Sequence, residues 1–258
     1  MTTPRNRYLE RKYGASYKWI AVLAVIIGLL SSIFSSTMVN VALTNIMADY
    51  DITQASAQWM STAYLSASTI CMLSSAWLMY NFGVRPAFML ATALFFSGSM
   101  LGQFAPEYGL LVLARVLQGS GAGILQPLTM ALVFLLFPHE KRGTALGTFS
   151  MVIVLGPAIG PTLGGIITDS LDWHYTFTAA LPLSFIGGFL GWKFLPDTRD
   201  EKSFSRFNYI SFLLIAITVA SFLNGLSESQ FHGFTDPKVI VFLSIALTGL
   251  TLFILRER

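Results

Sequence analysis

Arg115 has the clearest capacity for chemistry, because it places a guanidinium inside the long apolar segment 108–138. Gln118 and Gln126 follow it at helical spacing, so on a helix the three share one polar face. A charge inside an apolar helix is costly and is usually turned toward a cavity or a partner. The stripe therefore indicates a substrate or ion pathway with a permanent positive charge. The alternative is that Arg115 extends to the nearer surface and only holds helices together.

Two other apolar segments carry polar edges. Ser35 and Asn40 lie along one edge of the first segment, and Ser61 and Tyr64 lie along an edge of the second. Isolated serines in such helices more often bond their own backbone or pack between helices. Three polar-edged helices taken together nevertheless indicate a wet central path.

The residue types exclude most catalytic chemistry. Apart from Arg115, the apolar segments contain no Lys, Asp or Glu in their interiors, so a serine nucleophile would lack its base. The single cysteine cannot form an internal disulfide, and the three histidines share no metal-ligand spacing. We therefore expect no enzyme, no metal site and no cofactor.

The stretch 151–165, MVIVLGPAIGPTLGG, is the most unusual in the chain. Glycines recur in it at every fourth residue, which on a helix forms a smooth face for close approach of a neighbouring backbone. A proline follows each of two glycines, removing a helical hydrogen bond and bending the axis. The residues concerned are Gly156, Gly160, Gly164, Pro157 and Pro161.

The composition is that of a membrane protein. Of the 258 residues, 54% are hydrophobic and 11% are charged, whereas a soluble domain carries about a quarter charged residues. Charge-free segments long enough to cross a bilayer recur along the chain, and we predict an all-α bundle of eight transmembrane helices. The expected spans are 19–48, 52–84, 86–105, 108–138, 143–168, 173–195, 207–227 and 239–255.

These spans define four regions. We expect a basic cytoplasmic tail at 1–18, a six-helix bundle of two three-helix repeats at 19–195, a cytoplasmic linker at 196–206 and two additional helices at 207–258. Fourteen of the sixteen basic residues then fall on one side, which predicts that this side and the N-terminus are cytoplasmic. The basic charge is thus a topology signal and not a nucleic-acid surface.

Three motifs resemble those of the major facilitator superfamily, most closely its fourteen-helix drug:proton antiporter subgroup. The sequence GPAIGPTLGG, which ends at Gly165, is similar to the antiporter motif of the fifth helix. The sequence LARVLQGSGA is similar to the fourth-helix motif whose arginine, here Arg115, is implicated in proton coupling. Val39-Asn40-Val41 and Trp173 resemble further signatures of the first and sixth helices. The resemblance spans the chain and implies an N-terminal half with two connecting helices.

The chain departs from the family pattern at two places. In the loop after the second helix only Gly83 and Arg85 match the family motif, and Tyr80 stands where an acid is usual. In the first helix Ser35 stands where an acid is common, four residues before Val39. This half therefore lacks a membrane-embedded carboxylate to carry a proton, and an anionic or neutral substrate becomes more plausible.

The resemblance implies proton-coupled export of drugs or other small molecules by alternating access, energised by a proton gradient. The expected surroundings are a plasma membrane or bacterial inner membrane, and the expected partners are lipid, a small-molecule substrate and either a missing C-terminal half or a partner subunit. An alternative is a non-transporting sensor or assembly subunit that reuses half of the fold.

Overall fold

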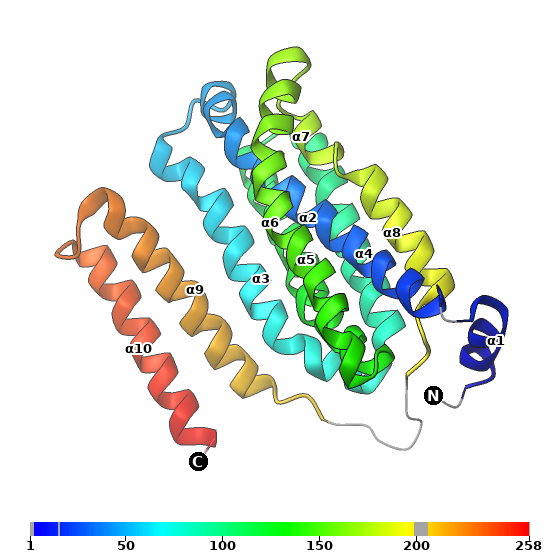
Figure 1. The fold of residues 1–258 in the computed structure, drawn as a ribbon. Helices are drawn as coiled ribbons and strands as arrows, with labels where there is room; N and C mark the ends of the chain where they lie inside the picture. Colours follow the sequence, from blue (N-terminus) through cyan, green and yellow to red (C-terminus); the bar gives the residue numbers. More distant parts are fainter. Residues whose placement is uncertain (1–2, 15, 199–205, 258) are drawn as a thin grey trace.

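The computed structural model describes residues 3–14, 16–198 and 206–257, and this part of the chain is all-helical (Figure 1). Both termini lie at the same end of the bundle. The helices are α1 (Pro4–Tyr13), α2 (Ser16–Asp49), α3 (Gln54–Phe82), α4 (Val84–Gln103), α5 (Tyr108–Leu136), α6 (His139–Ser170), α7 (Tyr175–Thr178), α8 (Leu181–Phe194), α9 (Tyr209–His232) and α10 (Pro237–Glu257).

The expected number of eight membrane helices is not matched. In the described part of the chain, seven helices are both long enough and apolar enough to cross a membrane, with α7 and α8 forming one span. The helix left out is α3, which has 29 residues and no charge. Its many hydroxyl and amide side chains lower its mean hydropathy. The prediction rested on the length of segments without charged residues, so these neutral polar side chains did not affect it. α3 nevertheless lies in the bundle, between α5 and α9.

The sixth expected span is interrupted instead of continuous. Its first turn is α7, and two residues separate the end of α7 from the start of α8. Pro182 stands in the first turn of α8, where its missing N–H leaves the carbonyl of Thr178 without a helical donor. α8 then runs beside α2 and α4.

α5 lies against both α3 and α4, while α2 packs against α6 and α8. Glycines set the distances around α5. A Cβ at Gly119 would lie 2.3 Å from the carbonyl oxygen of Tyr64 on α3, and one at Gly123 would lie 2.1 Å from that of Ser68. On the other side, a Cβ at Gly121 would lie 2.4 Å from a carbonyl oxygen of α4. Backbone atoms cannot rotate aside, so only glycine permits these approaches.

Two hydrophobic clusters fill the bundle, one above the other. The cluster at the end with the termini includes Phe88 and Leu125. The cluster at the opposite end includes Ile46 and Met60. Along both α2 and α5, a polar interval separates the residues of one cluster from those of the other.

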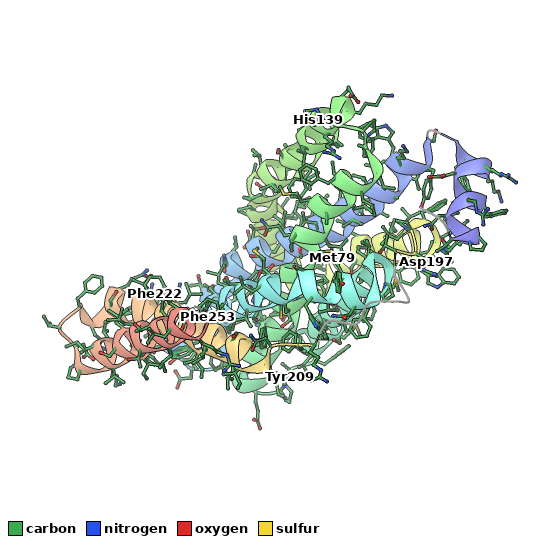
Figure 2. All side chains as sticks on the ribbon, turned by 90° about the horizontal axis from the view of Figure 1, so that it is seen from below. Met79, His139, Asp197, Tyr209, Phe222 and Phe253 are labelled. Carbon is green, nitrogen blue, oxygen red and sulfur yellow. The ribbon has the colours of Figure 1, made fainter. Side chains whose placement is uncertain are left out.

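α9 and α10 form a hairpin that projects beside α3 (Figures 1 and 2). The hydroxyl of Thr62 on α3 donates to that of Ser227 on α9 at 3.2 Å. Where the chain leads into α9, the ring of Phe207 lies edge-on to Trp77, with centroids 4.7 Å apart. Few residues of the hairpin are buried, so its surface is left for lipid or further protein.

Replacing Gly123 by Ala should destabilise the bundle, because the new Cβ would meet the backbone of α3. We expect the free energy of unfolding to fall by about 1–3 kcal/mol, as for other overpacked sites. Thermal unfolding of the purified protein in detergent measures the change. Gly109→Ala on the same helix is the control, since its Cβ would meet nothing within 4 Å. Equal melting temperatures for the two variants would contradict the role given to Gly123.

Candidate functional site

Arg115 lies in the interior of the bundle, about 10 Å along α5 from the start of that helix. Only 1% of its surface is exposed, so it does not reach the surface. Its Nη1 donates to Oε1 of Gln118 at 2.9 Å, and its Cζ lies 4.2 Å from the ring centroid of Tyr64. No carboxylate among the described residues lies within ion-pair distance. The guanidinium is thus solvated by an amide and an aromatic face.

Gln118 joins three helices. Its Nε2 donates to the hydroxyl of Ser35 on α2 at 3.0 Å and to that of Ser99 on α4 at 2.9 Å. A guanidinium has no acceptor, so the amide oxygen must face Arg115 and the amide nitrogen must face the serines. All four side chains are buried. They form a polar layer, defined here as Ser35, Ser99, Arg115 and Gln118, between the two hydrophobic clusters.

Tyr64 separates this polar layer from a cavity. The cavity has a volume of about 240 Å³ and is lined by residues of α2, α3, α5 and α6, among them Ser32, Tyr64 and Gln126. The Tyr64 ring covers Arg115, and its hydroxyl points to the carbonyl oxygen of Ser32 at 3.4 Å. A displacement of this single ring would therefore open Arg115 toward the cavity.

The structure brings only some of the predicted polar residues together. Ser35, Arg115 and Gln118 meet in the polar layer, whereas Gln126 is exposed and lines the cavity. Asn40 lies toward the C-terminal end of α2, where it is exposed and accepts a hydrogen bond from the hydroxyl of Ser61 at 2.9 Å. Among the described residues, no three side chains of metal-binding type lie together.

Ser99 is the member of the polar layer that sequence reasoning missed. α4 also carries Ser97 and Gln103, and nothing in the spacing of these residues singles out Ser99. The available signal was the preceding Gly98, at which a Cβ would lie 2.7 Å from the carbonyl oxygen of Ala114. A Gly-Ser pair in an apolar helix indicates close contact with a neighbour, and here the neighbour carries Arg115.

The three spaced glycines of α6 face α2, and each is in contact with it. A Cβ at Gly156 would lie 2.3 Å from Cγ2 of Ile33, and one at Gly160 would lie 1.8 Å from Oγ1 of Thr37. A Cβ at Gly164 would lie 2.9 Å from a backbone atom of α2. This glycine face therefore brings α6 directly against the helix that carries Ser35.

The remaining residues of the motif point away from this contact. Pro157 and Pro161 are exposed, and α6 continues through both of them. Each proline withholds one N–H, so two carbonyl groups of α6 lose their helical donors. A Cβ at Gly165 would meet nothing within 4 Å, which separates this glycine from the packing face.

Gly83 is the one residue between α3 and α4, and Arg85 lies in the first turn of α4. Gly83 has φ 90°, a value that favours glycine, and its N–H caps α3 by donating to the carbonyl of Met79. Arg85 pairs with Asp197 after α8, at 3.5 Å between Nη1 and Oδ1. Arg5 of α1 lies 3.9 Å from the same carboxylate. With Tyr80 in place of the usual acid, the loop arginine is thus linked to the segment after α8.

Apolar helices that are long enough to cross a membrane pack around a buried polar layer, which defines a multi-pass membrane protein. The family model described as Major Facilitator Superfamily matches residues 25–256. The chain belongs to the major facilitator superfamily, which confirms the resemblance seen in its motifs.

Curated relatives are bacterial members of this superfamily. The chain is 33% identical over 255 residues to the lincomycin resistance protein LmrB of Bacillus subtilis, covering 96% of the chain and 53% of LmrB. It is 31% identical over 234 residues to the riboflavin transporter RibZ of Clostridioides difficile, covering 89% of the chain and 51% of RibZ. The chain thus spans about half the length of the curated relatives it matches.

Solved structures show the same fold at low identity. The human organic anion transporter MFSD10 matches with a TM-score of 0.63 at 15% identity, over 92% of this chain and 70% of that one. A peptide transporter of the POT type, crystallised with sulfate, matches with a TM-score of 0.63 at 16% identity, over 86% of this chain and 48% of that one.

Replacing Gln118 by Leu should destabilise the protein, because Arg115 Nη1 and two serine hydroxyls would lose their partner. We expect a loss of about 2–3 kcal/mol in the free energy of unfolding, measured by thermal unfolding in detergent. Gln126→Leu is the matched control on the same helix, since that side chain is exposed. If the two variants have the same melting temperature, the polar layer does not stabilise the bundle.

Proposed function

We propose that this chain forms the first half of a secondary transporter that exports a small molecule by alternating access, coupled to a proton gradient. The observation that carries the proposal is the buried, unpaired charge of Arg115 behind a cavity wall made by Tyr64. A charge held in a membrane bundle without a carboxylate is expensive and is expected at a functional site. The relatives named for lincomycin resistance and riboflavin transport support a transport role.

In this proposal the charge of Arg115 selects against cations. The guanidinium is permanently charged, and the described residues of the polar layer include no acid to offset it. Anionic or neutral molecules are therefore the favoured substrates of this half. The carboxylate that carries the coupling proton then lies outside the polar layer, in the part of the transporter that the curated relatives have beyond the matched half.

The contact between α6 and α2 is the proposed moving element. The α6 side of this contact carries no side chains at its glycines, so a shift of one helix along the other has to displace only the side chains of α2, such as Ile33 and Thr37. Pro157 lines the cavity, as do Ile33 on α2 and Ile153 on α6. A shift of α6 against α2 would therefore reshape the cavity wall directly while the cavity changes side.

Arg115→Ala should reduce proton-driven efflux at least tenfold, because the charge beside the cavity is lost. The codon is changed at the native chromosomal locus, so that any further coding sequence or partner is retained. Efflux of a panel of labelled compounds is measured with and without a protonophore, at matched protein levels. Arg11→Ala, an exposed residue of α1, is the control for the loss of one positive charge. Undiminished, protonophore-sensitive efflux in the Arg115→Ala strain would refute the proposed role.

Gly160→Leu should block transport, because the side chain would collide with Thr37 and separate α6 from α2. Gly165→Leu, a change five residues further along the same motif, should transport normally, since a Cβ at Gly165 meets nothing within 4 Å. A milder pair tests the same contact: Gly160→Ala should slow efflux, and adding Thr37→Ala should restore part of the rate. Transport rates are compared at equal amounts of folded protein in the membrane. Equal rates for Gly160→Leu and Gly165→Leu would reject the packing role.

A further inference from the structure

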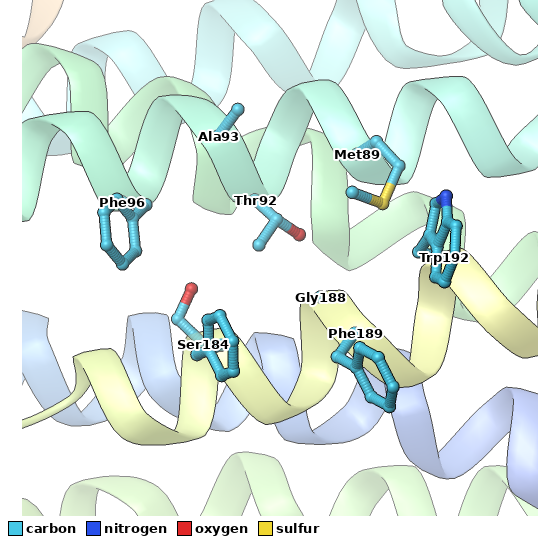
Figure 3. A pocket seen from close by; sticks show the side chains of 9 residues that line it. Met89, Thr92, Ala93, Phe96, Ser184, Gly188, Phe189 and Trp192 are labelled. Atoms are coloured by element: carbon cyan, nitrogen blue, oxygen red, sulfur yellow. The ribbon is translucent and has the colours of Figure 1, made fainter.

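A groove on the outer face of the bundle runs between α4 and α8 (Figure 3). It has a volume of about 470 Å³ and is mostly apolar, with Met89 and Phe96 on the α4 side and Phe189 and Trp192 on the α8 side. Half of the surface of Phe189 and of Trp192 is exposed. The groove therefore presents an apolar channel, parallel to the helices, at the face of a membrane protein.

A second pocket adjoins this groove at the end where α1 packs. It has a volume of about 390 Å³ and lies between α1 and the end of α8. Phe189 and Trp192 line both pockets, so the two spaces share a wall. Tyr8 and Tyr13 of α1 complete an aromatic rim. Trp and Tyr are the side chains that favour the boundary between hydrocarbon and head groups.

The second pocket is basic. Arg5, Lys12 and Lys193 line it, and its lining includes no acid. Arg5 donates to the carbonyl oxygens of Trp192 and Lys193 at 2.8 Å each, which fastens α1 to α8. Asp197 lies 3.9 Å from Arg5. Among the described residues, no acid lies within ion-pair distance of Lys12 or Lys193.

Lys12 is held as a cation at the mouth of this pocket. Its Nζ donates to the hydroxyl of Tyr8 at 3.2 Å, and this hydrogen bond is the main cause that raises the pKa of Lys12. The Nζ also lies 5.6 Å from the ring centroids of both Tyr8 and Tyr13. The pocket thus combines positive charge with aromatic walls and lies directly beside the apolar groove.

We propose that the two adjoining pockets together bind one anionic phospholipid from the leaflet on the side of α1. The phosphate lies between Lys12 and Lys193, and one acyl chain lies in the groove between α4 and α8. Basic pockets beside membrane helices bind anionic head groups in this way. The bound lipid would bridge α1, α4 and α8, whatever substrate the transporter carries.

The head-group end is tested with the full chain in nanodiscs, or in detergent titrated with lipid, by native mass spectrometry. Phosphatidylglycerol and phosphatidylcholine with identical acyl chains are the probes. We expect phosphatidylglycerol to bind more tightly, and Lys12→Gln with Lys193→Gln to weaken its binding on the order of tenfold. Arg7→Gln with Arg11→Gln removes the same charge from α1 outside the pocket and should leave binding unchanged.

The acyl-chain end is tested separately. Ala93→Trp fills the groove from its exposed rim and should weaken phosphatidylglycerol binding, whereas Ser97→Trp, exposed on α4 but outside the lining, should not. Equal binding of the two lipids, or equal loss in both charge variants, would overturn the proposal. Displacement of the lipid by inorganic phosphate at a similar concentration would also overturn it, since it would identify a site for free phosphate.

Discussion

A guanidinium without a carboxylate partner must be solvated by the protein itself, and the centre of this bundle is built around that requirement. Gln118 supplies an acceptor oxygen, and Tyr64 supplies an aromatic face. The amide of Gln118 is in turn held by Ser35 and Ser99. Burial of an unpaired charge costs far more than one neutral hydrogen bond returns. The polar layer therefore reduces the cost of the charge without removing it, and the charge is kept at some expense of stability.

The glycines determine whether this solvation is geometrically possible. Short polar side chains such as Ser35 and Ser99 reach Gln118 only if three backbones lie close together. Gly98 brings α4 against α5, and Gly119 brings α5 against α3. Close packing and buried polarity therefore depend on each other: a larger residue at Gly98 would move Ser99 away from Gln118, and one at Gly119 would move Tyr64 away from Arg115. The same small-residue packing joins α6 to α2 at Gly160, where it serves a contact between helices and not the solvation of a charge.

Much of this architecture was predictable, because membrane helices are recognised in a sequence as long apolar segments without charged residues. The helix order, the turns and the packing face of Gly156, Gly160 and Gly164 follow from spacing alone. The contribution of Ser99 did not follow, because hydrogen bonds between distant helices depend on which faces meet. The sequence also did not show that Gln118 is buried in the polar layer while Gln126 lines the cavity. Both residues lie on one helical stripe, and such a stripe can pass from a buried layer into a cavity wall. The polar character of α3 was visible in its residues, but counting charges concealed it.

Arg115 has a further consequence that comes from the membrane potential. A single charge without a nearby counter-charge moves as a net charge in the transmembrane field, and moving one elementary charge across 100 mV corresponds to about 2.3 kcal/mol. If rocking of α5 carries Arg115 across a tenth of that field, the conformational equilibrium gains about 0.2 kcal/mol of voltage dependence per 100 mV. The orientation preferred at rest would then depend on the energised state of the membrane, even before any substrate or proton binds.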